Sequence, residues 1–154
     1  METAPTYLVV IDDSPESRVA LRFAAMRASH VNAKLALIHV LPRPEFMQWG
    51  GVQEAMAAEA RTAAEALLAS MAEEAVGMGS AAPVTTIVEG EATTAIFNHV
   101  RQNAGIRALV LAAAAKGTPG PLVSYFAGER AGQLPCVLII VPGGLAPDRL
   151  ESLT

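Results

Sequence analysis

The sequence has a single cysteine and no apolar run long enough to cross a membrane. Its 154 residues are 52% hydrophobic, but alanines and polar residues interrupt the apolar stretches before they reach the roughly 18 residues that a span needs. Cys136 lies in the run CVLIIV, cannot form an internal disulfide and belongs to no metal-ligand spacing. We therefore expect a soluble protein without a membrane partner, a disulfide or a metal, in which Cys136 is a small buried hydrophobe.

Clustered positive charge is also absent. The 11 basic residues are scattered, the net charge is -4, and nothing resembles the electrostatic footprint of a nucleic-acid-binding protein. The N-terminal residues METAPTYLVVIDD contain no basic residue before the first apolar run and then reach two aspartates. This pattern is typical of neither a signal peptide nor a transit peptide, so we expect a cytoplasmic protein.

Five short apolar runs punctuate the chain. They are mostly continuous rather than alternating, as in strands that are buried on both faces of a parallel sheet. The predicted strands are YLVVI at 7–11, KLALIHV at 34–40, VTTIV at 84–88, RALVLA at 107–112 and CVLIIV at 136–141.

Four helical patterns lie between these strands. They are predicted over about 15–30, 52–76, 92–103 and 121–133, and the first is signalled by Ser14 as N-cap and Pro15 at the first helical position. The alternation of strand and helix predicts a doubly wound α/β fold of one domain, 1–154, with a core over 7–142. The tail over 143–154 is expected to fray.

The segment LPRPEFMQWGG, at 41–51, is the one long connection. Its large apolar side chains are Phe46, Met47 and Trp49. They either fold back over the second helix or form a lid or a contact with a partner protein.

The stretch YLVVIDDSPESRVALRFAAMRASHVNAKLALIHV is more specific than a general βαβ unit. It resembles the universal stress protein family, whose members open with a strand ending in Asp, an Asp/Gly-Ser-x-x-Ser turn, a helix and a second strand close to LIHV. The resemblance continues through IVEGEATTAI, ALVLA and LPCVLIIVP, and so covers Tyr7 to Pro142. It implies an adenine-nucleotide alpha-hydrolase-like fold with a five-stranded parallel sheet in the order 3-2-1-4-5 and two helices on each face.

The resemblance also implies where a nucleotide would lie. In ATP-binding members the aspartate after the first strand, here Asp12, lies at the nucleoside, and backbone near Val40 meets the adenine. The phosphates rest on a pattern of Gly, two residues, Gly, nine residues, then Gly followed by Ser or Thr. Counted along this sequence, the pattern falls on Ala113, Lys116, Phe126 and Ala127.

Every glycine and hydroxyl position of that pattern is therefore replaced. Glycines allow backbone N–H groups to approach phosphate oxygens closely, whereas a lysine or a phenylalanine would fill the space. Gly117 and Gly120 restore a Gly-x-x-Gly spacing shifted along the loop, but Pro119 and Pro121 have no N–H to donate. We expect a structural turn that does not bind ATP tightly, with a shifted phosphate cradle as the alternative.

Three polar residues at the ends of the first two strands are the other candidates. Asp12 and Asp13 suit a ribose or a metal, or simply the dipole of the following helix. His39 has no Ser, Cys or acidic partner in a recognisable motif, so we expect it to be a hydrogen-bonded packing residue. No catalytic residue is predicted.

The resulting hypothesis is a non-catalytic cytoplasmic stress-response protein without a resident cofactor. It is expected to form a homodimer through the last strand, Cys136 to Val141, and to act on an unidentified protein partner. The alternatives are a member that binds ATP or AMP with Mg²⁺ through a degenerate loop, and a small α/β enzyme that uses Asp12 or Asp13 with His39.

Overall fold

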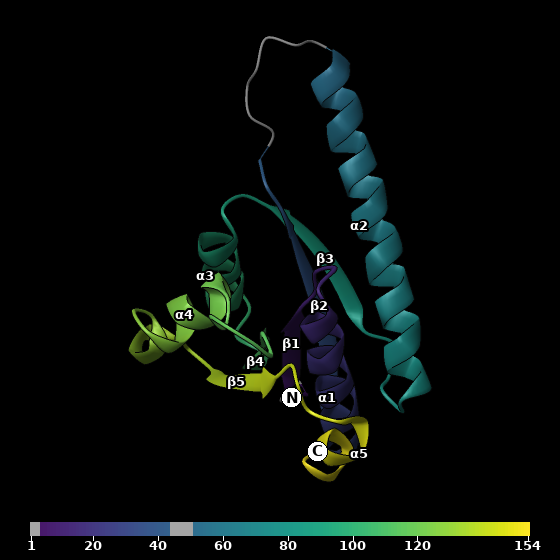
Figure 1. Cartoon of the computed structure of the whole chain (residues 1–154), viewed down its shortest axis with the longest axis vertical. Helices are drawn as coiled ribbons and strands as arrows, with labels where there is room; N and C mark the ends of the chain where they lie inside the picture. Colours follow the sequence, from purple (N-terminus) through teal and green to yellow (C-terminus); the bar gives the residue numbers. More distant parts are fainter. Residues whose placement is uncertain (1–3, 44–50) are drawn as a thin grey trace.

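The computed structural model describes residues 4–43 and 51–154. Strands and helices alternate along the chain (Figure 1). The strands are β1 (Thr6–Val10), β2 (Lys34–Leu41), β3 (Val84–Glu89), β4 (Ile106–Ala113) and β5 (Val137–Pro142). The helices are α1 (Pro15–Val31), α2 (Gly51–Gly77), α3 (Ala92–Gln102), α4 (Pro121–Ala127), a 3₁₀ turn η1 (Ala131–Gln133) and α5 (Pro147–Ser152).

The strands form one parallel sheet in the order β3-β2-β1-β4-β5. β1 lies at its centre, where Val9 is in register with Leu37 of β2 and Val110 of β4. All three side chains are fully buried, as the continuous apolar runs predicted. The predicted fold class and strand order are confirmed.

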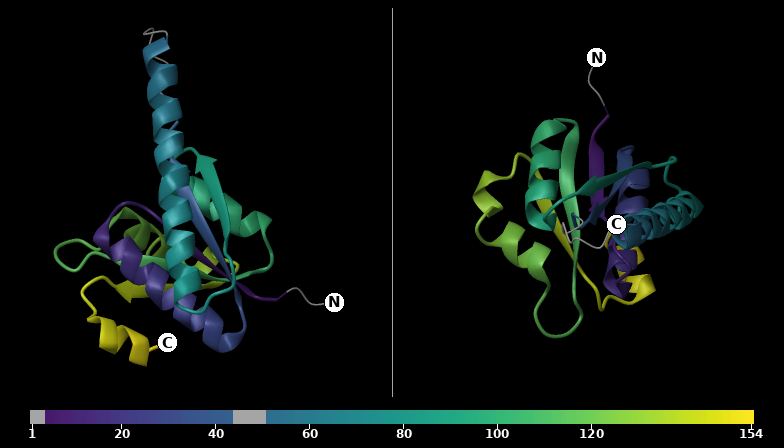
Figure 2. Two further views of the ribbon diagram at one scale, coloured as in Figure 1. Left: turned by 90° about the vertical axis from the view of Figure 1, so that its right-hand side faces the viewer. Right: turned by 90° about the horizontal axis from the view of Figure 1, so that it is seen from above.

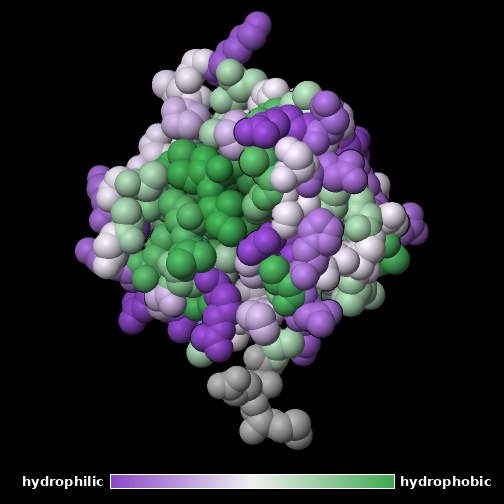
Figure 3. Space-filling view, turned by 90° about the horizontal axis from the view of Figure 1, so that it is seen from below, coloured by the Kyte–Doolittle hydropathy of each residue, from purple (hydrophilic) through white to green (hydrophobic). Residues whose placement is uncertain are grey.

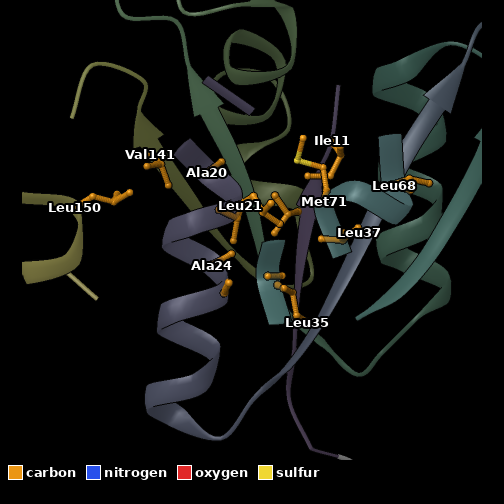
Figure 4. Close-up of a cluster of buried hydrophobic side chains, with 14 residues drawn as sticks. Ile11, Ala20, Leu21, Ala24, Leu35, Leu37, Leu68, Met71, Val141 and Leu150 are labelled. Carbon is orange, nitrogen blue, oxygen red and sulfur yellow. The ribbon is translucent and has the colours of Figure 1, made fainter. Parts of the chain in front are cut away.

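Two apolar clusters fill the two faces of the sheet. On one face α1 and α2 cover the sheet, and Leu21, Leu37 and Met71 meet beneath them (Figure 4). On the other face α3 and α4 pack Ile96 and Phe126 against Leu109. Each fully buried side chain of this size contributes roughly 1.5–3 kcal/mol, so the two clusters together hold the layers in place.

Helix α1 begins and ends where its sequence dictates. Ser14 accepts a hydrogen bond from the backbone N–H of Ser17 at 3.3 Å and Pro15 occupies the first turn, which confirms the predicted cap. The helix ends at Asn32 in the left-handed conformation, with φ 58°. Two arginines of this helix, Arg18 and Arg22, both pair with the carboxylate of Glu74 in α2, at 3.1 Å each.

Helix α2 is longer than the sheet that it covers. Its buried residues, Ala64, Leu68, Met71 and Ala75, all belong to the C-terminal half. The N-terminal half extends past the sheet (Figures 1 and 2), and Val52 and Met56 are more than half exposed there. The predicted role of Phe46, Met47 and Trp49 in the preceding connection lies outside the described residues.

The fourth helix is shorter than predicted. It ends at Ala127 because Gly128 leaves the helical conformation, with φ −100° and ψ −99°. The chain then turns through η1. The sequence pattern over 121–133 merged a helix, a glycine and a 3₁₀ turn into one element, because glycine lowers helix propensity without excluding a helix.

The prediction of a frayed tail was wrong. Residues 147–152 form α5, and Leu150, only 2% exposed, joins the cluster beneath α1. Thr154 accepts a hydrogen bond from Arg27 Nη1 at 3.1 Å through its backbone oxygen. Apolar contact of Leu145 and Leu150 with the core explains this order. Among the helices that the structure describes, none is long and apolar enough to cross a membrane.

Candidate functional site

A cleft opens at the carboxyl edge of the sheet, between the ends of β1 and β4 and the start of α4. It has a volume of about 140 Å³, and its walls include Asp12, Ser14 and Glu16 on one side and Gly120 to Val123 on the other. Open parallel sheets bind ligands at such an edge. Sites for nucleotide-sized ligands, however, usually enclose about 300–1,000 Å³.

The β1–α1 turn on one wall is closed by its own hydrogen bonds. Asp12 Oδ1 accepts from the backbone N–H of Ser14 at 2.8 Å and from the Ser14 hydroxyl. The Asp12 N–H donates to Ser17 Oγ at 3.0 Å, and that hydroxyl donates to the Val10 carbonyl at 3.4 Å. The polar groups of this turn are therefore largely occupied by one another.

Negative charge dominates this wall. The carboxylates of Asp12 and Glu16 both line the cleft. Asp13 is exposed and lines a separate hollow between α1 and α2, beside Arg18 and Met71. Two carboxylates facing the cleft oppose the approach of a phosphate chain.

The loop after β4 is a self-contained turn. The N–H of Ala114 donates to the carbonyl of Pro119 at 3.1 Å, which removes one donor from the loop, and Pro119 and Pro121 offer none. Gly117 and Gly120 have φ values of 77° and 112°, a region that L side chains rarely adopt. The turn geometry alone therefore accounts for both glycines.

The predicted loop residues lie in different surroundings. Lys116 and Gly117 are exposed, Ala113 is partly buried, and Gly120 belongs to the cleft wall. Gly120 is the N-cap residue of α4, and its helix starts with Pro121. Of the glycine and lysine positions predicted here, the structure brings only Gly120 into the cleft.

The prediction that Phe126 fills the phosphate space was wrong. Its side chain is fully buried in the core beside Ile96 and Leu109, and its ring meets that of Tyr125 edge-on, with centroids 5.0 Å apart. Ala127 is the last residue of α4 and is exposed. Both positions therefore lie at the C-terminal end of α4, away from the Gly120 to Val123 segment that lines the cleft.

At the end of β2, Val40 and His39 are held by contacts within the sheet. Val40 is paired with Val88 of β3 and packs against the second core cluster. His39 Nδ1 lies 2.6 Å from the carbonyl oxygen of Ile11, to which it donates. The predicted hydrogen-bonded packing role of His39 is confirmed.

Glu91 is an ionised group that the sequence analysis did not single out. Its carboxylate is the N-cap of α3 and accepts hydrogen bonds from the backbone N–H groups of Thr93 and Thr94. The hydrogen bond from the Thr93 hydroxyl makes the largest contribution, and together with the other hydrogen bonds it lowers the pKa of Glu91 from 4.5 to about 2. The sequence does contain a signal for this N-cap, because an acidic residue lies directly before a helical pattern.

Two further observations bear on metal binding and on the reactivity of Cys136. No cluster of three or more metal-ligating side chains occurs in the part of the chain that the structure describes. Burial raises the pKa of the half-buried Cys136 thiol and lowers that of His99. A raised pKa disfavours the thiolate, the reactive form of cysteine.

The model of the universal stress protein family matches residues 6–142. The chain belongs to this family. Solved structures agree with the assignment: universal stress protein UspA from Lactobacillus plantarum has a TM-score of 0.68 and 21% identity, over 92% of this chain and 99% of that one. A search of curated proteins finds no match.

Two other solved structures of universal stress proteins are complexes with nucleotides. A universal stress protein in complex with cAMP has a TM-score of 0.64 and 18% identity, over 93% of this chain and 100% of that one. The universal stress protein from Archaeoglobus fulgidus in complex with dAMP has a TM-score of 0.61 and 16% identity, over 92% and 99%. At these identities the likeness shows a shared fold.

Proposed function

We propose that this chain is a non-catalytic, cytoplasmic stress-response protein that does not bind ATP tightly. It acts as a homodimer and transmits its signal through contact with another protein. The proposal rests on the shortage of free N–H donors in the loop after β4. One N–H is bonded within the loop and two prolines lack an N–H, and the facing wall carries the carboxylates of Asp12 and Glu16.

The dimer is proposed to form through β5. This strand is paired on one side by β4 and has no strand on its other side within the described sheet. Val137 is 63% exposed and Ile140 is 38% exposed. Figure 3 views the end of the molecule at which β5 lies in Figure 1 and shows a continuous hydrophobic area. An apolar strand edge of this kind favours pairing with a second copy.

A second candidate function is weak binding of ATP or AMP with Mg²⁺ in the same cleft. The two universal stress proteins in complex with cAMP and dAMP support it, as does the position of the cleft at the carboxyl edge of the sheet. In this case Asp12 would meet the ribose, Val40 would lie near the adenine, and Gly117, Gly120 and Lys116 would meet the phosphates.

An enzyme that uses Asp12 or Asp13 with His39 has less support. His39 Nδ1 is bonded to a backbone carbonyl, and the carboxylate of Asp12 accepts from Ser14. General acid–base catalysis requires a group within hydrogen-bond reach of a substrate. Both side chains are therefore occupied by hydrogen bonds within the protein, at the ends of the first two strands.

Direct binding separates the two leading candidates. The purified chain is denatured with acid and the released nucleotides are separated by chromatography, and equilibrium dialysis then measures uptake of labelled ATP with Mg²⁺. We expect no co-purified adenine nucleotide and a dissociation constant weaker than about 1 mM, an affinity of about -4.1 kcal/mol. Stoichiometric nucleotide, or a micromolar constant, would favour the second candidate.

A further inference from the structure

Two arginines converge on one aromatic ring at the opposite end of α3 from the cleft. Arg101 lies in the last turn of α3, and Arg130 follows α4. Their guanidinium carbons are 5.7 Å and 4.6 Å from the centroid of the Phe97 ring. That residue is only 9% exposed, so both guanidinium groups lie against the same largely buried ring.

The guanidinium of Arg130 is oriented by neutral partners. Its Nε donates to the Tyr125 hydroxyl at 2.7 Å, and its Nη1 donates to Gln133 Oε1. Tyr125 in turn packs edge-on against the fully buried Phe126. A chain of contacts from the core therefore fixes the guanidinium plane and leaves Nη2 without a hydrogen bond among the described residues.

No carboxylate neutralises this arginine pair. Within residues 4–43 and 51–154 the ion pairs involve Arg18, Arg22 and Arg61, and neither Arg101 nor Arg130 takes part. Arg101 makes no hydrogen bond to the described part of the chain. In a protein with net charge -4, these two guanidinium groups lie against one ring without an ion-pair partner among the described residues.

We propose that Arg101 and Arg130, placed over Phe97, bind a phosphate group carrying two negative charges. Arg101 presents paired N–H donors whose spacing matches two oxygens of a phosphate, and Arg130 presents its Nη2 donors, because its Nε and Nη1 already donate to Tyr125 and Gln133. A phosphate monoester carries a charge of about -1.5 to -2 near neutral pH, which balances both arginines, whereas one carboxylate would balance only one. The group can belong to a phosphorylated small molecule or to a phosphorylated serine of a peptide.

This site is distinct from the cleft. α3 begins at the carboxyl edge of the sheet, beside Gly90, and ends before Ile106, where β4 starts. The cleft lies at the ends of β1 and β4. The arginine pair therefore binds its ligand at the amino edge of the sheet, independently of any nucleotide.

The test is a titration of the full chain followed by the ¹H–¹⁵N signals of the arginine Nε–H groups. The probes are inorganic phosphate, a sugar phosphate and a short phosphoserine peptide, with acetate as the monoanion control. We expect the Arg101 and Arg130 signals to move with all three phosphates and much less with acetate. If the sugar phosphate binds tightest, the ligand is a small molecule, and if the peptide does, the ligand is a phosphorylated chain.

Variants assign the effect to these two residues. Arg101→Gln is expected to weaken phosphate binding by about tenfold, since a hydrogen bond between charged groups contributes about 1.5–3 kcal/mol. Arg130→Lys keeps the charge but loses the guanidinium that Tyr125 and Gln133 orient, so it should weaken binding as well. The matched control is Arg149→Gln, an exposed arginine of α5.

Melting curves of each variant show that the fold is retained, and Arg101→Gln is the safer variant because this side chain makes no hydrogen bond among the described residues. Equal loss of binding in Arg149→Gln and Arg101→Gln would mean general charge attraction. That result, or the absence of any shift at the two Nε–H groups, would overturn the proposal.

Discussion

Single residues decide how the carboxyl edge of the sheet is arranged, and Gly143 is the clearest case. Its N–H donates to the carbonyl of Ala113 at 2.8 Å as the chain leaves β5. A Cβ at this position would lie 2.6 Å from that oxygen and 2.7 Å from the Cβ of Glu16. Gly143 thus brings the chain after β5 into contact with Ala113 and Glu16, which are both far from it in the sequence.

Gly143→Ala should lower the free energy of unfolding by about 1–3 kcal/mol, because the added methyl group meets backbone that cannot move aside. Gly144→Ala is the matched control, since its Cβ would meet only the Ala115 Cβ at 3.4 Å. Chemical denaturation of both variants measures the difference. A stability loss in Gly144→Ala as large as that in Gly143→Ala would contradict the packing argument.

Glu91 makes stability depend on pH at the start of α3. Its pKa is depressed in the folded protein, so its contribution is complete above the unfolded value of about 4.5 and disappears as the pH falls toward about 2. Glu91→Ala should lower the free energy of unfolding by about 1 kcal/mol at pH 7. The difference in the free energy of unfolding between Glu91→Ala and the original chain should therefore disappear as the pH falls from about 4.5 to about 2.

Denaturation at several pH values checks this dependence, with Glu73→Ala, an exposed position of α2, as the control. That variant should stay within about 0.5 kcal/mol of the original chain at every pH. A Glu91→Ala deficit that persists unchanged at pH 2 would show that the carboxylate is not the stabilising group.

Elements with strong local signals were predictable from the sequence. The continuous apolar runs identified all five strands, and Ser14 with Pro15 identified the start of α1. The short helix α5 was missed because two or three apolar residues in a polar tail give no periodic pattern. Its order comes from the burial of Leu150 against α1, which is a tertiary contact.

The candidate site was predicted less well than the fold. Asp12 and Gly120 do line the cleft, but Ala127 and Phe126 belong to the far end of α4. The sequence spacing alone could not show which of these positions face the cleft, because that depends on how α4 packs against the core. The arginine pair over Phe97 also escaped notice, because its members are separated along the chain and meet only in the folded protein.

Leu150→Ala tests whether α5 is a structural part of the fold. Removing a buried leucine side chain should lower the free energy of unfolding by about 2–5 kcal/mol. Leu153→Ala, at a position that is 46% exposed, should have a much smaller effect. Equal effects of the two substitutions, measured by thermal and chemical denaturation, would mean that α5 does not dock as described.

At the scale of the whole molecule, the two sheet edges are unequal. β3 is bordered by α2, and Glu89 at its end pairs with Arg61 of that helix at 3.1 Å. β5 presents Val137 and Ile140 without a charged residue between them. The apolar edge is therefore the one that we expect to pair with a second copy.

Val137→Lys with Ile140→Lys should convert the proposed dimer into a monomer, because two like charges on an antiparallel strand pair repel each other. Light scattering should give twice 16.0 kDa for the original chain and 16.0 kDa for the variant. Ile139 is a poorer choice because it packs against the core. A monomeric mass for the original chain at tens of micromolar would contradict the proposed dimer.

A thermal melt with Mg-ATP shows whether the turn after β4 holds ATP. A ligand at five times its dissociation constant stabilises a folded chain by about 1 kcal/mol, or roughly 2–4 °C in Tm for a protein of this size. With Mg-ATP at about 5 mM we expect a smaller shift than this, since binding weaker than about 1 mM gives less stabilisation. A shift well above 4 °C would contradict the account and would assign the phosphates to Gly117 and Gly120.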